Sequence, residues 1–238
     1  GQQDSKAGYV LGGGTIIEDY KSNLALRLPD YRLASQIRNR INERFGYETA
    51  LALAPGSIEL RIPTKYLESK SRFIQLVRAT YLVDAPGFAE KRIMTNTEKL
   101  AGSKDRNAGE IALEAIGNAA LPKLAALLNS SDPDVHFRAA RCMFNLGDVR
   151  GRELLRAIAT DKSSSYRMDA IEAIVNAAGQ DTASMLRSLL RDDDLAIRLI
   201  AYENLVRFQD VTVNRRAIAG SFYLDQVTQT GKPAILIS

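Results

Sequence analysis

Apolar positions in the second half of the chain repeat every 31 residues. The repeat shows as columns of similar side chains, which are Leu124, Leu155 and Leu186; Leu127, Ile158 and Leu189; Ala139, Ala170 and Ala201; and Met143, Ile174 and Leu205. Within one repeat the first two columns share a face of one helix, and the last two share a face of a second helix. The pattern predicts helix pairs over residues 106–210 that stack and share a continuous core.

The turn inside each pair carries a capping signal. Asp132, Ser163 and Asp194 form one column, and their side chains are of the kind that accepts hydrogen bonds from the first N–H groups of a helix. The alanine column lies on the second helix, where small side chains let neighbouring helices approach closely. We therefore expect the second helix of each pair to begin at these caps, with residues 108–117 as a half-repeat that caps the stack.

The first hundred residues follow a different pattern, with short runs of alternating apolar and polar positions. Alternation predicts strands at residues 24–28, 51–53 and 58–62. Apolar residues return every three or four positions at 30–46, after the break at Pro29, and again at 65–81, which predicts two helices. The order strand, helix, strand, strand, helix predicts an α+β module with its helices on one face of a small sheet.

The predicted fold class is thus an N-terminal α+β module, an α-solenoid of helix pairs and a C-terminal β segment. We place the module at residues 8–84, a linker helix at 85–105, the repeats at 106–210 and a β-hairpin at 211–238. The first strand of that hairpin contains Phe222 and Leu224, residues 230–233 form its turn, and residues 234–237 form its second strand. Because Ser238 follows the last strand directly, the hairpin could be cut from a longer sheet.

Composition and charge narrow the classes of function. The chain is 45% hydrophobic and 25% charged, which is usual for a globular protein. No run approaches the ~18 apolar residues of a membrane span, so we expect none. A net charge of +4 over 238 residues offers little attraction to nucleic acid, which we do not expect as the main partner.

Two short segments and two single residues are candidates for chemistry. Gly12-Gly13-Gly14-Thr15 is rich in glycine, but it lacks the Gly-Lys-Ser/Thr of a phosphate loop, and Ile17 stands where a dinucleotide motif needs glycine. Asp192-Asp193-Asp194 precedes a predicted helix, so we interpret it as a cap and not as a cation site. The single histidine, His136, and the single cysteine, Cys142, fall on different faces of one helix. We expect Cys142 to be a buried small side chain, and we predict no catalytic residue, metal or cofactor.

One polar column repeats through the helix pairs and is the candidate binding site. It consists of His136, Arg167 and Arg198. The functional interpretation is a basic ridge that binds an acidic protein partner. The interpretation that we favour is a ladder of ion pairs between repeats, with acids such as Asp169 and Glu172 as partners.

The repeats resemble a known family. Residues 134–148, DVHFRAARCMFNLGD, resemble the second helix of the short HEAT-like repeat, and the likeness continues at Tyr166-Arg167 and Ile197-Arg198. It covers about residues 106–210. The resemblance implies a scaffolding or protein-binding role without chemistry of its own.

The N-terminal module resembles a second family, the flagellar P-ring proteins. The likeness rests on Asn23 to Leu28, on Pro29-Asp30-Tyr31, on the helix ASQIRNRINERFG that ends at Gly46, and on the strand that ends at Pro63. It covers about residues 8–84. This family implies a periplasmic ring around the flagellar rod, built from many copies, although its ordinary members carry no helical repeat.

Together these observations predict a structural, non-enzymatic protein of the bacterial cell envelope. It would be P-ring-like, take part in flagellar basal body assembly, lie in the periplasm and bind proteins through its helical repeat. We expect flagellar or envelope proteins as partners, with self-association, and no small-molecule substrate. The alternative is a soluble intracellular adaptor that binds an acidic protein.

Overall fold

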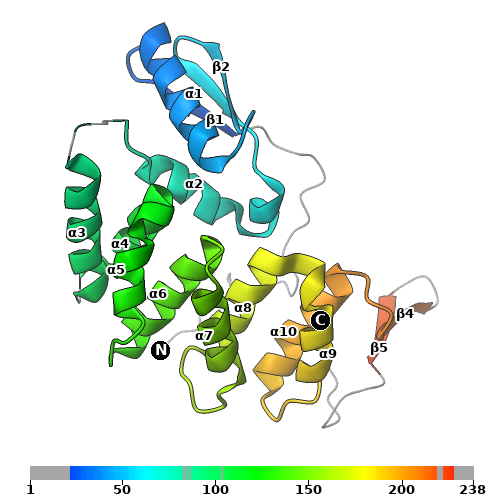
Figure 1. Ribbon diagram of the computed structural model, residues 1–238. Helices are drawn as coiled ribbons and strands as arrows, with labels where there is room; N and C mark the ends of the chain where they lie inside the picture. The colour runs from blue at the N-terminus through cyan, green and yellow to red at the C-terminus, as the bar shows by residue number, and fades with distance from the viewer. Residues whose placement is uncertain (1–21, 83–84, 86, 103, 219–221, 228–238) are drawn as a thin grey trace, which may run out of the picture. The chain divides into compact units, whose positions relative to one another are not determined.

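The structure is a computed structural model, and it describes residues 22–82, 85, 87–102, 104–218 and 222–227. Small N-terminal strands are followed by a run of helices and then by a C-terminal pair of strands (Figure 1). The chain divides into two compact units. The larger unit is Lys21–Gly179, and the smaller includes Gln180–Ser238.

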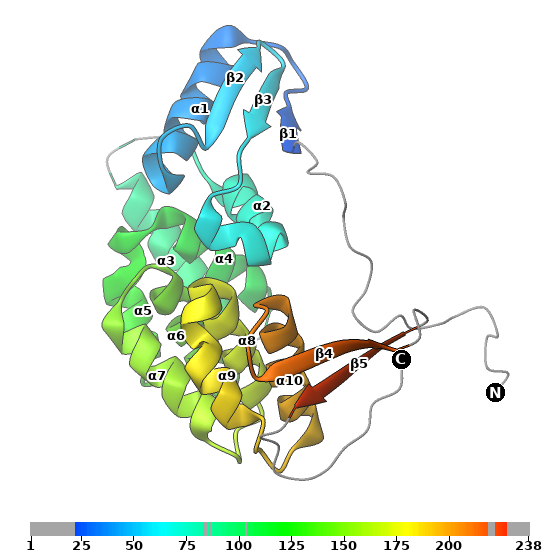
Figure 2. The same ribbon diagram turned by 90° about the vertical axis from the view of Figure 1, so that its right-hand side faces the viewer.

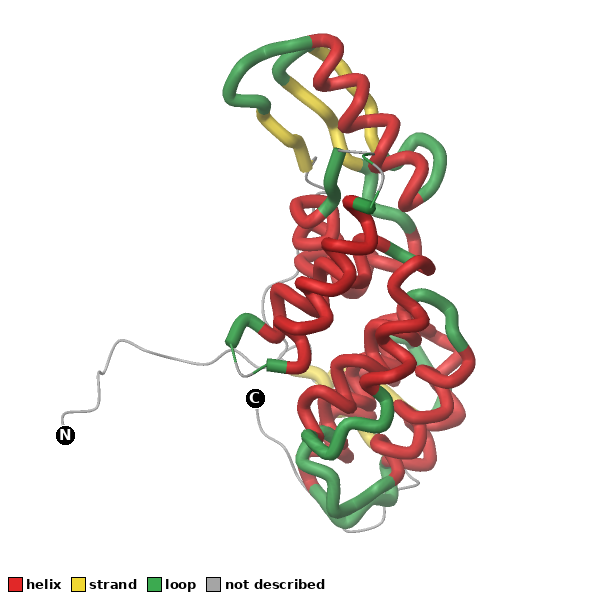
Figure 3. The backbone as a smooth tube through the Cα atoms, turned by 60° about the vertical axis from the view of Figure 1, so that its left-hand side comes forward, coloured by secondary structure: helices red, strands yellow, loops and turns green. Residues whose placement is uncertain are grey.

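The larger unit begins with a three-stranded antiparallel sheet. Its strands are β1 (Ser22–Ala25), β2 (Ala50–Ala54) and β3 (Ser57–Leu60), in the order β1-β3-β2. Helix α1 (Tyr31–Phe45) covers one face, as Figure 2 shows, and Figure 3 shows the strands in yellow beside this helix in red. The predicted strand, helix, strand, strand order is confirmed.

Helix α1 begins and ends at the residues that the sequence predicted. The Asp30 side chain accepts hydrogen bonds from the backbone N–H groups of Arg32 and Leu33, at 2.7 and 3.0 Å. Gly46 ends the helix with φ at 113°, a conformation that side chains with a Cβ rarely adopt. The strand prediction was too long, because β1 ends at Ala25 and the chain then turns toward Pro29, which leaves Leu28 80% exposed.

The helix predicted at 65–81 forms in two parts, a 3-10 turn η1 (Thr64–Ser69) and helix α2 (Lys70–Ala79). The 3-10 turn buries Tyr66 beside Phe73 of α2, with the ring centroids 5.3 Å apart. Helix α2 shares the core of the sheet and also packs along a later helix, α4. The module therefore continues directly into the helical part.

The rest of the larger unit is helical. Its elements are α3 (Phe88–Ala101), α4 (Arg106–Ile116), the 3-10 turn η2 (Asn118–Ala120), α5 (Leu121–Leu127), α6 (Pro133–Asn145), α7 (Val149–Thr160) and α8 (Arg167–Ala178). Consecutive helices pack in pairs, α3 with α4, α5 with α6 and α7 with α8. This layout agrees with the predicted helical repeat. The segment placed as a linker helix is α3, and it packs against α4.

Helices approach closely where the sequence has small residues. A Cβ added at Gly109 of α4 would lie 2.7 Å from the backbone nitrogen of Leu100 in α3. One added at Gly151 of α7 would lie 2.5 Å from the backbone nitrogen of Phe144 in α6. The alanine column Ala139, Ala170 and Ala201 is fully buried, as predicted.

One predicted cap is wrong. Asp132 caps α6, as expected, but α8 begins at Arg167 and not after Ser163. The carboxylate of Asp161 instead accepts hydrogen bonds from the backbone N–H and the hydroxyl of Ser163, at 2.9 and 2.6 Å. This local turn occupies Ser163, so the helix starts later.

In the smaller unit, α9 (Ala183–Leu189) and α10 (Leu195–Arg207) pack together, after a 3-10 turn η3 (Gly179–Thr182). Strand β4 (Val213–Ile218) pairs antiparallel with β5 (Phe222–Val227). The hairpin prediction had missed β4, because its polar centre, Asn214-Arg215-Arg216, hides the alternation. The predicted turn at 230–233 and strand at 234–237 lie outside the described residues, as does the Gly12–Thr15 segment.

Replacing Ala170 with leucine is expected to destabilise the protein by about 1–3 kcal/mol, because the larger side chain has no room at this fully buried position. Urea unfolding followed by circular dichroism measures the change. Ala177→Leu is the matched control, because Ala177 is exposed on the same helix. Equal unfolding midpoints for Ala170→Leu and the parent would contradict the burial of this column.

Candidate functional site

The predicted basic ridge is not a surface feature. Arg167 is only 8% exposed, and its Nε donates a hydrogen bond to the backbone oxygen of Ala159 at 3.1 Å. Arg198 is 9% exposed, and its Nη1 donates to the backbone oxygens of Asp192 and Asp193 at 2.7 and 3.0 Å. These arginines hold the loops and helix ends before their own helices, while His136 is half-buried. The ridge prediction is therefore corrected.

The other residues considered for chemistry, Cys142 and the aspartates before α10, have structural roles. Cys142 is fully buried, and burial raises the pKa of its thiol well above the usual range, so the reactive thiolate is disfavoured. Asp194 caps α10 by accepting a hydrogen bond from the Ala196 N–H at 2.8 Å. Among the residues that the structure describes, no group of three His, Cys, Asp or Glu side chains could hold a metal ion.

A cluster of charged side chains lies between α2, α4 and α6, and we call it the charge cluster. At its centre is Glu110 of α4, which is fully buried. Its carboxylate accepts a hydrogen bond from Arg72 of α2 at 2.7 Å, and it also accepts two from Arg141 of α6, both at 2.7 Å. Arg138 of α6 adds another at 3.0 Å. A buried carboxylate is tolerable only with such partners.

The second acid of the cluster is Glu114, one helical turn after Glu110 and also fully buried. Its carboxylate pairs with Arg72 and accepts a hydrogen bond from the Asn145 side chain at 3.1 Å. One of its oxygens, Oε1, is buried without a hydrogen-bond partner among the described residues, as is the hydroxyl of Tyr66. Burial and the charge of Glu114 raise the pKa of Tyr66 to about 12.

Ion pairs extend the charge cluster toward the surface along α6. Arg138 also pairs with Asp134 at 2.7 Å, and Asp134 pairs with Arg106 at 3.0 Å. Arg106 pairs in turn with the helix-capping Asp132 at 2.6 Å. The acids and arginines are balanced, so the cluster is neutral overall and every charge has an opposite neighbour.

Electrostatics keep Glu110 ionised. Burial alone would raise the pKa of its carboxyl, but Arg72 and Arg141 outweigh burial and lower the pKa to about 2. The two carboxylates likewise raise the pKa of Arg72, against the effect of its own burial. The cluster is thus fixed in its charged form at neutral pH, which suits a structural junction better than proton transfer.

A second arginine from the N-terminal part reaches the same helix. Arg44 of α1 donates hydrogen bonds to the backbone oxygens of Glu114 and Ala115, at 2.5 and 3.0 Å. These carbonyls belong to the last turn of α4, where the helix has free acceptors and a negative dipole end. Arg44 therefore caps α4 from a position 70 residues earlier in the sequence.

Apolar packing joins the same elements. Helix α4 is buried on all sides from Gly109 to Ala115. Its Ile111 and Ala115 belong to the core of the sheet, α1 and α2, whereas its Leu113 belongs to the core of α3, α5 and α6. One helix thus serves two hydrophobic cores, and the charge cluster lies beside them.

Sequence reasoning missed this junction. Its signal was present, because Glu110 and Glu114 stand at a four-residue spacing inside the otherwise apolar run of α4. Acids in such a position need buried cations. The sequence does not show that the main cation would be Arg72, 38 residues earlier than Glu110.

Comparisons with known proteins divide the chain near α3. Residues 6–99 match the family model of the flagellar P-ring protein, and residues 97–175 match that of HEAT repeats. A flagellar P-ring protein of Thermotoga maritima is 31% identical over 78 residues, which cover 29% of this chain and 24% of that protein. The chain thus spans about a quarter of the length of this relative.

No solved structure matches the chain. In the part of the chain that is described, no helix combines the length and apolar character needed to cross a bilayer. Residues up to α3 are therefore similar to flagellar P-ring proteins, and the helices from α3 to α8 are similar to HEAT repeats.

Proposed function

We propose that this is a structural, non-enzymatic protein of the bacterial cell envelope that takes part in flagellar basal body assembly. Its P-ring-like segment would make the contacts to neighbouring copies or to the flagellar structure. Its HEAT-like helices would bind a partner protein. Both families are scaffold types, and stacked helix pairs offer extended surfaces for protein binding.

The observation that carries the proposal is the junction at α4. The core of the P-ring-like segment and the core of the helices share this helix. Arg44 and Arg72 of the P-ring-like segment bind it through hydrogen bonds and ion pairs. A scaffold that joins two binding surfaces must hold them in a fixed relation. Shared apolar packing and a neutral buried charge cluster provide that rigidity.

The P-ring-like segment also exposes apolar side chains of the kind that protein interfaces bury. Leu28, Tyr31 and Leu53 are 80%, 72% and 64% exposed. The loop that carries Leu28 is tied to the turn after β2 by a hydrogen bond from the Asp30 N–H to the Pro55 oxygen at 2.9 Å. We place the contacts of this segment at these side chains.

In the alternative, an intracellular adaptor, the acidic partner rested on the basic ridge. Arg167 and Arg198 are buried and bonded to backbone oxygens, so that basis is lost. We retain protein binding by the helices, without an acidic partner at this ridge.

Quantitative mass spectrometry of purified flagellar basal bodies, from the bacterium that encodes the chain, tests the function. We expect the protein to be enriched with the known ring components. The variant Leu28→Ser with Tyr31→Ser should fold with an unchanged melting temperature but be depleted from the basal bodies. Arg38→Ser, an exchange in the same helix at a side chain that bonds to Asn39, serves as the control. Absence of the parent protein from basal bodies would contradict the proposal.

A further inference from the structure

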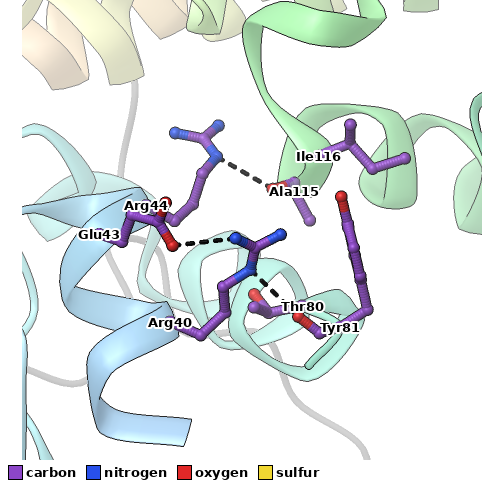
Figure 4. A pocket seen from close by; sticks show the side chains of 7 residues that line it. All are labelled: Arg40, Glu43, Arg44, Thr80, Tyr81, Ala115 and Ile116. Atoms are coloured by element: carbon purple, nitrogen blue, oxygen red, sulfur yellow. Dashed lines mark hydrogen bonds and ion pairs between the residues drawn. The ribbon is translucent and has the colours of Figure 1, made fainter. Parts of the chain in front are cut away.

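A small cavity lies where the end of α1 meets the ends of α2 and α4. Its volume is about 170 Å³, and it is lined by Arg40, Glu43, Arg44, Thr80, Tyr81, Ala115 and Ile116. Figure 4 shows the guanidinium groups of Arg40 and Arg44 and the phenol of Tyr81 around this space. The cavity has room for a few waters or one small ligand.

Positive charge gathers around Tyr81. The guanidinium carbon of Arg40 lies 4.8 Å from the centroid of the Tyr81 ring, and that of Arg92 lies 4.9 Å from it. Two cations, Arg40 and Arg44, line the cavity, and Arg92 lies on the ring of Tyr81 beside it. The acid that lines it, Glu43, pairs with Arg40 at 2.9 Å, but its side chain is 69% exposed, so water screens this pair.

Two hydrogen-bond donors at the cavity, one on Arg44 and one on Tyr81, have no acceptor among the described residues. Nε and Nη2 of Arg44 donate to the last carbonyls of α4, which leaves Nη1. The hydroxyl of Tyr81 makes no hydrogen bond within the described residues. Arg40 donates from Nε to the backbone oxygen of Tyr81 at 3.2 Å and from Nη1 to Glu43 at 2.9 Å, which holds its guanidinium at the cavity. The carbonyls of α4, which would repel an anion, are already satisfied by Arg44.

We propose that this cavity binds an oxyanion of the carboxylate or phosphate type, held by Arg40, Arg44 and the hydroxyl of Tyr81. Planar guanidinium groups and a phenol are the donors that suit such oxygens, and hydrogen bonds between charged groups are the strong ones. The ligand bridges α1 and the end of α4, so its binding stabilises the junction. It is either a free anion or an acidic side chain of a partner protein.

Isothermal titration calorimetry at low ionic strength tests this on the full chain, because salt screens such sites. The probes are inorganic phosphate, acetate and an acetylated triglutamate peptide. We expect saturable binding of one equivalent. Phosphate binding tighter than the peptide indicates a free anion, and peptide binding tighter than phosphate and acetate indicates a partner's side chain.

Variants separate binding from folding. Tyr81→Phe keeps the ring and its cation–π contacts, so we expect an unchanged melting temperature without ligand and affinity about tenfold weaker. Arg40→Gln should weaken binding at least as much. Arg38→Gln, whose side chain bonds to Asn39 outside the cavity, should bind like the parent. No saturable binding of any probe, or equal affinity in Tyr81→Phe and the parent, would overturn the proposal.

Discussion

Replacing Arg72 with alanine is expected to lower the free energy of unfolding by about 3–5 kcal/mol. Arg72 pairs with both buried acids of α4, and its own side chain is only 17% exposed. Its removal leaves Glu114 without an ion pair among the described residues and takes one cation from Glu110. An uncompensated buried charge costs far more than the loss of a surface ion pair.

Urea unfolding followed by circular dichroism measures the effect of Arg72→Ala. The matched control is Arg78→Ala in the same helix, because Arg78 is exposed and makes no hydrogen bond or ion pair within the described residues. We expect the control to change the free energy of unfolding by less than about 0.5 kcal/mol. A similar small change in Arg72→Ala would show that α2 does not hold the two acids.

Acid is expected to remove about 3 kcal/mol of stability through Glu110. The folded state lowers the pKa of this carboxyl from 4.5 to about 2, and each pKa unit is worth about 1.4 kcal/mol. A lowered pKa means that folding favours the ionised form. Its contribution is therefore complete above about pH 4.5 and is lost as the pH falls from there toward about 2.

Urea midpoints measured between pH 6 and pH 2.5 follow this loss, with Glu110→Gln as the test variant. Glutamine cannot titrate, so the variant should be less stable at pH 6 and should lose less stability on acidification. Glu153→Gln is the control, since Glu153 is exposed on α7 and makes no hydrogen bond or ion pair within the described residues. Parallel pH curves for Glu110→Gln and the parent would show that Glu110 is not the group responsible.

The sequence predicted the local elements of the fold well, because their causes are local. The Asp30 cap, the Gly46 stop and the alternation around Ile58 each act within a few residues. The 31-residue columns likewise predicted which faces would be buried, and Leu124, Leu155 and Leu186 are all fully buried. The wrong cap at Ser163 also has a local cause, because the carboxylate of Asp161, two residues earlier, binds the Ser163 N–H.

The predicted basic ridge was wrong because residue type alone does not show whether an arginine is exposed or buried. Arg167 and Arg198 repeat in the sequence like exposed residues of a binding face, yet long side chains can lie along a helix end and reach backbone oxygens. The partner of a buried acid is also a nonlocal matter. Arg44 and Arg72 come from different helices of the N-terminal part, and only folding brings both to α4.

The central claim is that the P-ring-like segment and the HEAT-like helices form one structural body through α4. Native-state amide hydrogen exchange tests it most directly, with Ile58 in the sheet and Met143 in α6 as probes, both fully buried. We predict that the two amides exchange with the same opening free energy, and that Arg72→Ala lowers both by the same amount. A lower opening free energy at Ile58 that Arg72→Ala leaves unchanged would contradict the claim.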